Sequence, residues 1–289
     1  MLLLQHLLNG LLAGAYYLLI ALGLSLIFAL GGIVNLAHGA FYAIGAYLAV
    51  TIGSRLGFTG AILISPVLVG ILGMVIERTL FRRFYKSDPA LSLLLTFGLA
   101  MVAEQALRMI YGAPPLAWAI PAGLRGTFVV GDFFYPKYRA FLIAVAVLCV
   151  GGLWLLLQRT PFGRVVRAGV QNADMVGALG ISLQPYMAAV AFIGIGLAGL
   201  AGAMLAPIFA IHPAMGAEII TSAFVVVVIG GLGSFWGVVL AALIVGVVKG
   251  MVTAAGYPQY SEAAIYLLML LVLLARPRGL FGERIVRFE

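Results

Sequence analysis

The chain has 289 residues, of which 64% are hydrophobic and only 9% are charged, and its formal net charge is +8 at pH 7. Because soluble globular proteins carry about 25% charged residues, this composition excludes an ordinary water-soluble fold and makes lipid the solvent for most of the chain. In a soluble protein the positive charge would suggest nucleic acid as a partner. Here we attribute it to basic residues at the ends of membrane helices, where they set topology and meet anionic lipid.

Long apolar tracts follow one another along the whole chain. They cover residues 8–30, 38–54, 60–80, 89–111, 139–157, 186–206, 218–232, 235–254 and 262–275. A membrane helix needs about 20 apolar residues, whereas a membrane β-barrel would show short strands of alternating polarity. The sequence therefore predicts one all-α integral membrane domain over residues 1–289, a bundle of about eight or nine segments. The tract 218–232 is short, and we expect a tilted or re-entrant segment there.

A polar block, GGIVNLAHGA, separates the first two tracts. Gly31, Gly32 and Gly39 permit a sharp reversal of the chain. Polar side chains at membrane depth are usually satisfied by neighbouring helices or line a watery path. We therefore expect Asn35 and His38 to hold the inner ends of the first two helices by hydrogen bonds and to border a cytoplasmic exit. The alternative is that they only cap a tight turn. No second metal ligand lies near this histidine in the sequence, so no metal site is expected.

Basic residues choose the cytoplasmic side of a membrane protein, and they gather in three segments of this chain. These are the connection after 60–80, the connection after 139–157 and the tail, with Arg78, Arg82, Arg83 and Lys86, with Arg159, Arg164 and Arg167, and with Arg276, Arg278, Arg284 and Arg287. The connection 112–138, with the mixed charges Arg125, Asp132 and Lys137, then lies outside. This pattern predicts an external N-terminus, a cytoplasmic C-terminus and an odd number of crossings.

Two further features concern helix packing. Glu104 and Arg108 lie four residues apart on one helix face, and we expect a structural ion pair that lowers the cost of holding each charge near lipid. The sequence also allows a pair between Glu218 and Lys249. Small residues at four-residue spacing let helix backbones approach closely. They occur at Gly194, Ala198 and Gly202, and again at Gly233, Gly237 and Ala241.

The segment 158–186 is too polar to span a membrane and long for a bare loop. Thr160 is followed by a proline, which is a helix-start pattern. A second helix start is available at Asn172 or Asp174, and Gly180 suits a left-handed helix stop. The sequence therefore predicts a cytoplasmic helical hairpin.

This hairpin is predicted to expose an apolar edge formed by Met175, Val176 and Leu179, flanked by Arg164 and Arg167. Such an edge needs a surface to cover it. The residues alone leave two alternatives open, a docked partner protein or a helix lying flat on lipid headgroups.

Five stretches, taken together and in this order, resemble the permease subunits of ABC importers for branched-chain amino acids, the Liv-type pair, and are closer to its H subunit. They are NGLLAGAYYLLIALGLSLIF, GIVNLAHGAFYAIGAYLA, GRVVRAGVQNADMVGALGIS, VVVIGGLGSFWGVVLAALIVG and LLMLLVLLARPRGLFG. The resemblance implies that residues 159–184 form the cytoplasmic coupling loop, which departs from the Glu-Ala-Ala-rich pattern of other importers. It implies that the residues meeting the ATPase are Arg164, Arg167, Asp174, Met175, Val176, Leu179 and Gly180.

The same resemblance implies a set of partners. These are a second permease, homologous or identical, two cytoplasmic ATPase subunits and an external substrate-binding protein, in the inner membrane of a bacterium or an archaeon. The sequence contains no G-x-x-x-x-G-K-[ST] phosphate loop. We therefore expect ATP to be bound by the partner subunits, this chain to need neither cofactor nor metal, and its role to be transport by alternating access rather than catalysis.

Two rival functions remain open from the sequence. The nearest is the same kind of importer carrying urea, short amides or other amino acids. The other is a stand-alone channel or an ion-coupled carrier, which usually places charges or broken helices at the midplane. A membrane-embedded enzyme is the least supported, because His6, His38 and His212 lie apart and no catalytic motif occurs.

Overall fold

Helices make up nearly all of the regular structure in the computed structural model, which describes residues 2–85, 87–131 and 133–282. Four charged residues of the orientation prediction lie outside the described residues: Lys86, Asp132, Arg284 and Arg287. Within the described chain, seven helices are long and apolar enough to cross a membrane. The prediction of a helical, multi-pass membrane protein is therefore confirmed.

The helices fall where the apolar tracts predict them, with small shifts at their ends. In chain order they are α1 (Leu2–Gly31), α2 (His38–Thr79), α3 (Pro89–Tyr111), α4 (Lys137–Arg159), α5 (Pro161–Gln171), α6 (Ala173–Ala178), α7 (Gln184–Leu205), α8 (Met215–Gly230), α9 (Phe235–Ala254) and α10 (Ser261–Ala275). Short 3-10 helices cover Phe81–Arg83, Ala122–Leu124 and Pro258–Tyr260. The first apolar tract is extended by one turn or more at its N-terminal end.

Helix α2 contains two of the predicted tracts as two arms that meet at Gly57. This glycine has φ 71° and ψ −178°, which lies outside the helical region and which side chains with a Cβ rarely adopt. Ser65 of the second arm donates a hydrogen bond to the Gly45 carbonyl of the first at 2.8 Å. The arms therefore run back along one another, and both pack on α7, where Gly45 of the first arm meets Gly199 and Gly73 of the second meets Ile195.

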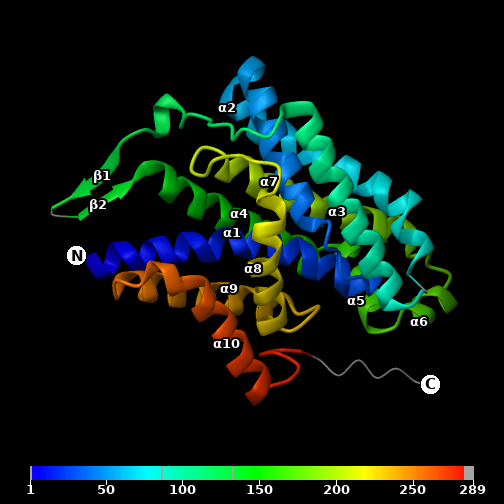
Figure 1. The fold of residues 1–289 in the computed structure, drawn as a ribbon. Helices are drawn as coiled ribbons and strands as arrows, with labels where there is room; N and C mark the ends of the chain where they lie inside the picture. The colour runs from blue at the N-terminus through cyan, green and yellow to red at the C-terminus, as the bar shows by residue number, and fades with distance from the viewer. Residues whose placement is uncertain (1, 86, 132, 283–289) are drawn as a thin grey trace.

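The N-terminal end of α1 lies beside a small antiparallel hairpin of β1 (Thr127–Val130) and β2 (Phe133–Pro136), which the sequence analysis did not predict (Figure 1). Gln5 donates to the Phe134 carbonyl at 3.2 Å, and the Tyr135 hydroxyl donates to the Leu8 carbonyl at 3.2 Å. Burial raises the pKa of Tyr135, so its hydroxyl stays a neutral donor. The connection 112–138 thus caps this end of the bundle.

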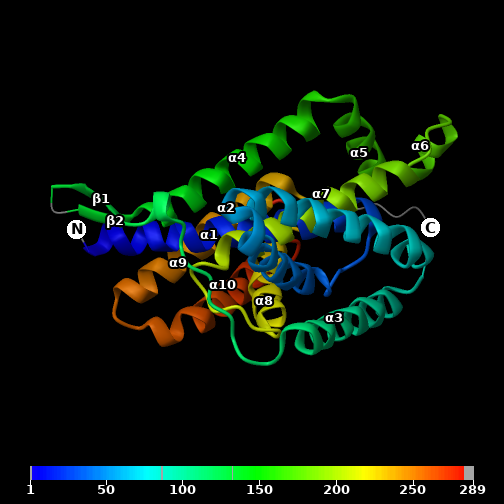
Figure 2. The same ribbon diagram turned by 90° about the horizontal axis from the view of Figure 1, so that it is seen from above.

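The basic connections gather at the opposite end of α1 (Figure 2). Gly31 packs on the ring of Tyr85, and Leu30 packs on Gly169 of α5. The start of the tail packs on the turn that precedes α9, through Gly231. The three basic segments therefore share one end of the molecule, with 112–138 at the other, which is the separation that the charge pattern predicts.

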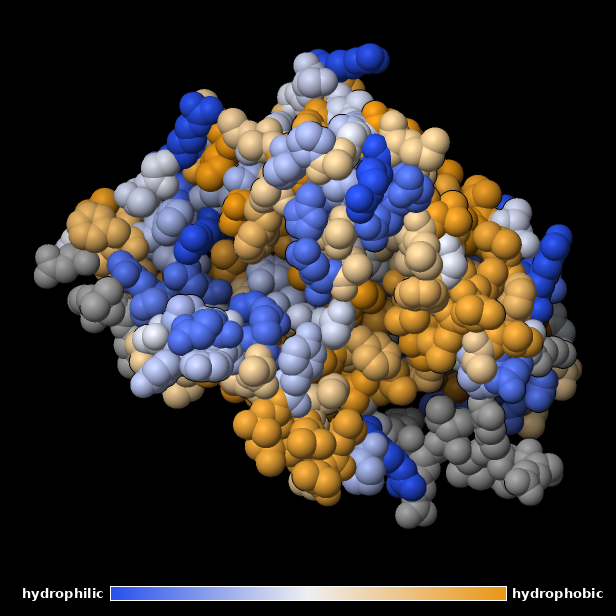
Figure 3. All heavy atoms as spheres, viewed as in Figure 1, coloured by the Kyte–Doolittle hydropathy of each residue, from blue (hydrophilic) through white to orange (hydrophobic). Residues whose placement is uncertain are grey.

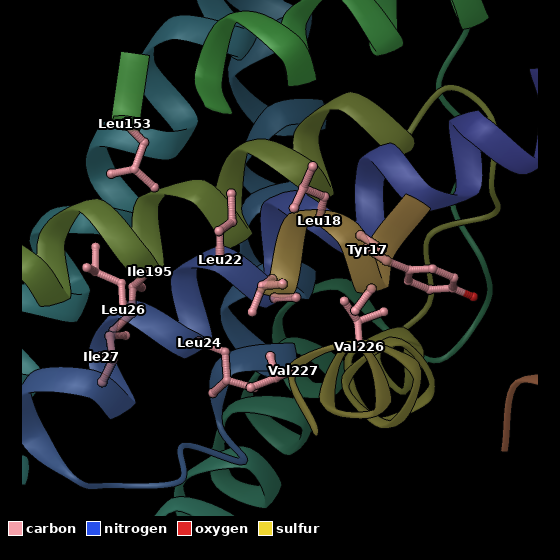
Figure 4. Packing of buried hydrophobic residues seen from close by; sticks show 14 of the residues in the cluster. Tyr17, Leu18, Leu22, Leu24, Leu26, Ile27, Leu153, Ile195, Val226 and Val227 are labelled. Atoms are coloured by element: carbon pink, nitrogen blue, oxygen red, sulfur yellow. The ribbon is translucent and has the colours of Figure 1, made fainter. Parts of the chain in front are cut away.

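Glycine lets the central helices touch through their backbones. Gly10 of α1 faces Gly246 of α9, and Gly23 of α1 faces Gly194 of α7, with no room for a Cβ at these crossings. Close approach of this kind is how helices associate where lipid removes the hydrophobic drive. Around these contacts the apolar side chains of α1 interdigitate with those of α4, α7 and α8 (Figure 4).

The two predicted small-residue stripes have different outcomes. In the first, Gly194 and Gly202 meet neighbouring backbones and Ala198 is fully buried, as predicted. The second is wrong in part, because Gly233 lies in the turn before α9 with φ 85° and not in a helix. A glycine in the left-handed region ends a helix rather than lining its face.

The outer surface is apolar over α3 and α10, where orange atoms dominate (Figure 3). Exposed apolar side chains on these helices are Leu94, Val102, Met109, Ile110, Leu267, Leu270, Leu271 and Leu274. Soluble monomers rarely expose contiguous apolar areas of this extent. These faces are therefore suited to lipid or to a membrane partner.

Candidate functional site

The polar block at residues 31–40 folds back into the bundle instead of forming a turn at the end of the bundle. Nε2 of His38, the first residue of α2, lies 3.1 Å from the Ile20 carbonyl. Ile20 precedes the end of α1 at Gly31 by eleven residues, or about 16 Å of helix. Gly32, with φ 67°, reverses the chain, whereas Gly39 lies within α2. The prediction that this block sits at the inner ends of the helices is therefore wrong.

Asn35 and His38 are both fully buried at this depth. The histidine makes the hydrogen bond to α1, but Nδ1 of the histidine and both polar side-chain atoms of Asn35 have no partner within the described part of the chain. The residue before α2 is Ala37, and no side-chain bond caps this helix. The alternative of a simple turn cap is therefore wrong as well, and neither residue lines the large cavity described below.

A second helix also starts inside the bundle. Residues 206–214 lead back from the end of α7, and α8 begins at Met215, where the backbone of Gly216 packs against Gly39 of α2. The 16-residue α8 runs across α1 rather than beside it, as Figures 1 and 2 show from two directions. This geometry agrees with the expected short, tilted segment.

A cavity of about 610 Å³ opens next to the start of α8, at the middle of the 30-residue α1. It is lined by aromatic rings, carboxylates and hydroxyls that come from four helices and from the α7–α8 connection. The side chains that carry its chemistry are Tyr16, Tyr17, Tyr42, His212, Glu218, Thr221, Ser222, Glu262 and Tyr266. The cavity is thus both aromatic and acidic, at mid-bundle depth.

The two carboxylates in this cavity have different partners. Glu262 is paired with Lys249 through Oε1, and the same ammonium donates to the Tyr17 hydroxyl at 2.9 Å. Among the described residues the basic partner of Glu218 is His212, with 3.6 Å between Oε2 and Nε2. The Glu218–Lys249 pair that the sequence allows does not form, because α9 and α10 pack together and bring Lys249 and Glu262 into contact.

Exposure distinguishes this cavity from the buried polar block. The side chain of Glu218 is 70% exposed and that of Glu262 is 48% exposed, although both lie at the middle of an apolar bundle. An ionised carboxylate facing hydrocarbon is costly and rare. This face of the bundle is therefore suited to water or to another protein, and poorly suited to lipid.

The sequence analysis missed most of this cavity. Its signals were the Tyr16–Tyr17 pair inside the first tract and Glu262 at the start of the last tract. Neither points to a site without knowing that α1 and α10 both border α8. Within the described residues no group of three histidine, cysteine or acidic side chains is placed to hold a metal ion.

The segment after α4 folds as two short helices. The Thr160 hydroxyl accepts from the Gly163 amide at 3.1 Å to cap α5. The Asn172 side chain accepts from the Met175 amide at 2.9 Å to cap α6, so the second helix starts at the first of the two predicted places. Gly180 has φ 78°, the left-handed conformation expected of the stop.

The exposed edge of this hairpin differs from the prediction at one residue. Met175 and Leu179 are 59% and 72% exposed, and Asp174 is exposed too, but Val176 is buried at 5%. Residues four apart share a helix face, whereas the next residue turns by about 100°, which directs Val176 away from that edge. Arg164 is also exposed, while Nη1 of Arg167 is buried.

The remaining predicted pair is present on α3. Arg108 Nη2 lies 3.0 Å from Glu104 Oε1, and both side chains are partly exposed. An exposed pair of this kind contributes little to stability. Its place away from the large cavity fits a local structural role.

Comparisons with known proteins place the chain in a family. Residues 6–273 match the family model described as the permease component of branched-chain amino acid transport systems. The permease protein BraD of Pseudomonas aeruginosa is 31% identical over 97% of this chain and 96% of that protein. LivH of Escherichia coli is 28% identical over 97% and 96%, and LivM of the same organism is 29% identical over 91% and 67%.

Among solved structures, the comparison matched PsaBC from Streptococcus pneumoniae in complex with Fab. The match covers 93% of this chain and 91% of that chain at 12% identity, with a TM-score of 0.49. The family model extends from α1 into α10 and so includes the mid-bundle cavity and the α5–α6 hairpin. The chain belongs to the family of permease components of branched-chain amino acid transport systems.

Proposed function

We propose that this chain is the membrane permease subunit of an ATP-driven importer for leucine, isoleucine and valine, and that its mid-bundle cavity borders the translocation path. Family membership supports the class of protein, and the relatives' names supply the cargo. The observation that carries the site is the exposure of Glu218 and Glu262 at the middle of an apolar bundle. Such groups need water or protein beside them.

The path would run between this chain and a second permease, homologous or identical. Glu262 is already neutralised by Lys249, so Glu218 is the carboxylate free to meet the ammonium group of an amino acid. The rings of Tyr16 and Tyr266 offer apolar area to an aliphatic side chain. A cavity of this size is in the usual range for small-molecule sites.

The end of the bundle that carries the basic connections is proposed to face the cytoplasm of a bacterium or archaeon. The α5–α6 hairpin then projects into the cell, where Met175 and Leu179 would dock on a partner ATPase, with Arg164, Asp174 and Gly180 beside them. The end with the β-hairpin would receive an external binding protein. ATP would be bound and hydrolysed by two ATPase partners, since this sequence has no phosphate loop.

The experiment is leucine uptake by proteoliposomes that contain the whole importer, purified through a tag on this chain. Glu218→Gln keeps the shape and removes the charge, and we expect uptake to fall by about tenfold, the value of one charge-assisted hydrogen bond. The matched control is Glu104→Gln, which removes a carboxylate outside the cavity. Full uptake by Glu218→Gln together with a loss in the control would refute the placement of the path.

The rival functions predict other results from the same preparation. An importer of urea or short amides would carry a cargo without an ammonium group, and its purified binding protein would bind that cargo rather than leucine. A channel or ion-coupled carrier would pass substrate when this chain is reconstituted alone, without ATP. Glu218 has no lysine or arginine partner among the described residues, so its charge favours a cationic group on the cargo, and therefore an amino acid.

A further inference from the structure

A second cavity lies towards the end of α1 that carries the basic connections. It has a volume of about 260 Å³ and is enclosed by α1, α4, α5 and the start of α9. Helices α4 and α9 both pack on α1 and flank it in Figure 1. One wall is apolar, with Leu22, Leu26, Leu153 and Leu157, and Figure 4 shows three of these leucines close together.

Polar side chains also line this cavity. They are Ser25, Gln158, Arg167 and Gln171, and the ring of Trp154 lines it too. The cavity is thus amphipathic, with an apolar part that follows α1 towards the middle of the bundle and a polar part under α5.

Arg167 is the charged group in this lining, and no acidic side chain of the described residues forms an ion pair with it. Its Nη1 is buried and has no hydrogen-bond partner among the described residues. The stretch 158–173 contains Arg159, Arg164 and Arg167 and no acidic residue. A buried guanidinium nitrogen without an acceptor is costly, and a guanidinium fork matches the geometry of a phosphate group.

The depth of the cavity indicates where that phosphate comes from. Helix α5 packs on the end of α1, through Gly169 and Leu30, so Arg167 stands where the bundle leaves the membrane. Tryptophan is enriched at this level, and basic pockets between helices on the cytoplasmic side hold anionic headgroups. We infer that this cavity binds one anionic phospholipid, with its phosphate on Arg167 and an acyl chain along the apolar wall.

A free phosphate ion has the same chemistry at Arg167 but no use for the leucine wall. The two sources are therefore separable. The inference does not depend on the mid-bundle cavity, because the two cavities share no lining residue.

The test is native mass spectrometry of the purified full chain with phosphatidylglycerol or phosphatidylcholine added. We expect one retained phosphatidylglycerol per chain, and about tenfold weaker retention in Arg167→Ala. The matched control is Arg164→Ala on the same helix, where the arginine is exposed, and it should retain the lipid. Equal retention of both lipids by the wild-type chain, or loss in both variants, would overturn the inference.

A second measurement keeps the test independent of the stability of the variant. Trp154 lines the cavity, so in a chain with Trp118 and Trp236 changed to Phe its fluorescence reports on the occupant. Brominated phosphatidylglycerol should quench it more than brominated phosphatidylcholine, and millimolar inorganic phosphate should not reverse the difference.

Reversal by phosphate would show a free-anion site instead. If neither brominated lipid quenched Trp154 in the assembled importer, a protein subunit would be shown to cover the cavity. Either result overturns the lipid assignment.

Discussion

Two polar regions lie at the middle of α1, and they differ in exposure more than in composition. Asn35 and His38 are fully buried in what we call the sealed region, and the helix starts of α2 and α8 touch there through glycine backbones. Beside Glu218 and Glu262 a cavity of about 610 Å³ opens, and both carboxylate side chains are well exposed. Polarity at membrane depth is common to both regions, whereas exposed charge distinguishes the second, which we propose borders the path.

The difference has a packing cause. In the first region Gly39 and Gly216 allow two backbones to meet, which leaves no room for a side chain between them. In the second, α1, α8, α10 and the α7–α8 connection surround a cavity that Tyr16 and Tyr17 line. We therefore expect the first region to control stability and the second to control transport.

The largest expected effect comes from breaking the sealed region. Gly39→Val would drive a side chain into the backbone of Gly216, and overpacking of this kind costs about 3 kcal/mol. Thermal unfolding of the purified chain in detergent should show a large fall in midpoint. Gly98→Val is the control, because that helical glycine has open space around it. Equal effects of the two changes would contradict the account.

A smaller effect is expected from the ion pair at the open region. Lys249→Met leaves Glu262 without its ammonium partner, and Glu262→Gln leaves Lys249 without its carboxylate partner. Since both groups are partly exposed, the coupling should be about 1 kcal/mol, measured by a double-mutant cycle on unfolding midpoints. Additive effects of the two changes would show that the pair is not coupled.

A further effect on stability is expected from removing the hydrogen bond between His38 and α1. His38→Ala should lower the free energy of unfolding by about 1 kcal/mol. Leucine uptake per folded importer should stay at the wild-type level, because the side chain does not line the large cavity. A loss of uptake without a loss of stability would show that this histidine takes part in transport and would contradict the account.

The smallest effect is expected at Asn35. Both of its polar atoms are buried without partners among the described residues, so Asn35→Leu should leave stability unchanged or raise it by about 1 kcal/mol. Denaturation of purified protein measures this directly. A large destabilisation would mean that Asn35 has a bonding role that its surroundings do not show.

Most of the fold follows from the sequence because apolar length determines where a membrane helix lies. The tract 89–111 matches α3 and the tract 235–254 matches α9 residue for residue. Local capping is also encoded locally, as Asn172 and Gly180 show. The hairpin of β1 and β2 was missed, since four-residue strands beside prolines give little periodic signal.

The site was harder to predict because it depends on contacts between distant segments. His38 looks like a turn residue in the sequence, but the segment before it runs back along α1 and buries it. Lys249 has two acidic candidates at helix starts, and only the packing of α9 on α10 selects Glu262. Periodicity reports which face of a helix is apolar, not which helices meet.

The most direct test compares the accessibility of the two regions to water. In a chain with Cys149→Ala, single cysteines replace Thr221 of the open cavity, Asn35 of the sealed block and Val147, which is exposed on α4. Their reaction with a charged thiol reagent is measured in the assembled importer, with and without leucine. We predict that Thr221→Cys reacts and is protected by leucine, while Asn35→Cys and Val147→Cys do not react. Reaction at Asn35→Cys with leucine protection, and none at Thr221→Cys, would contradict the central claim.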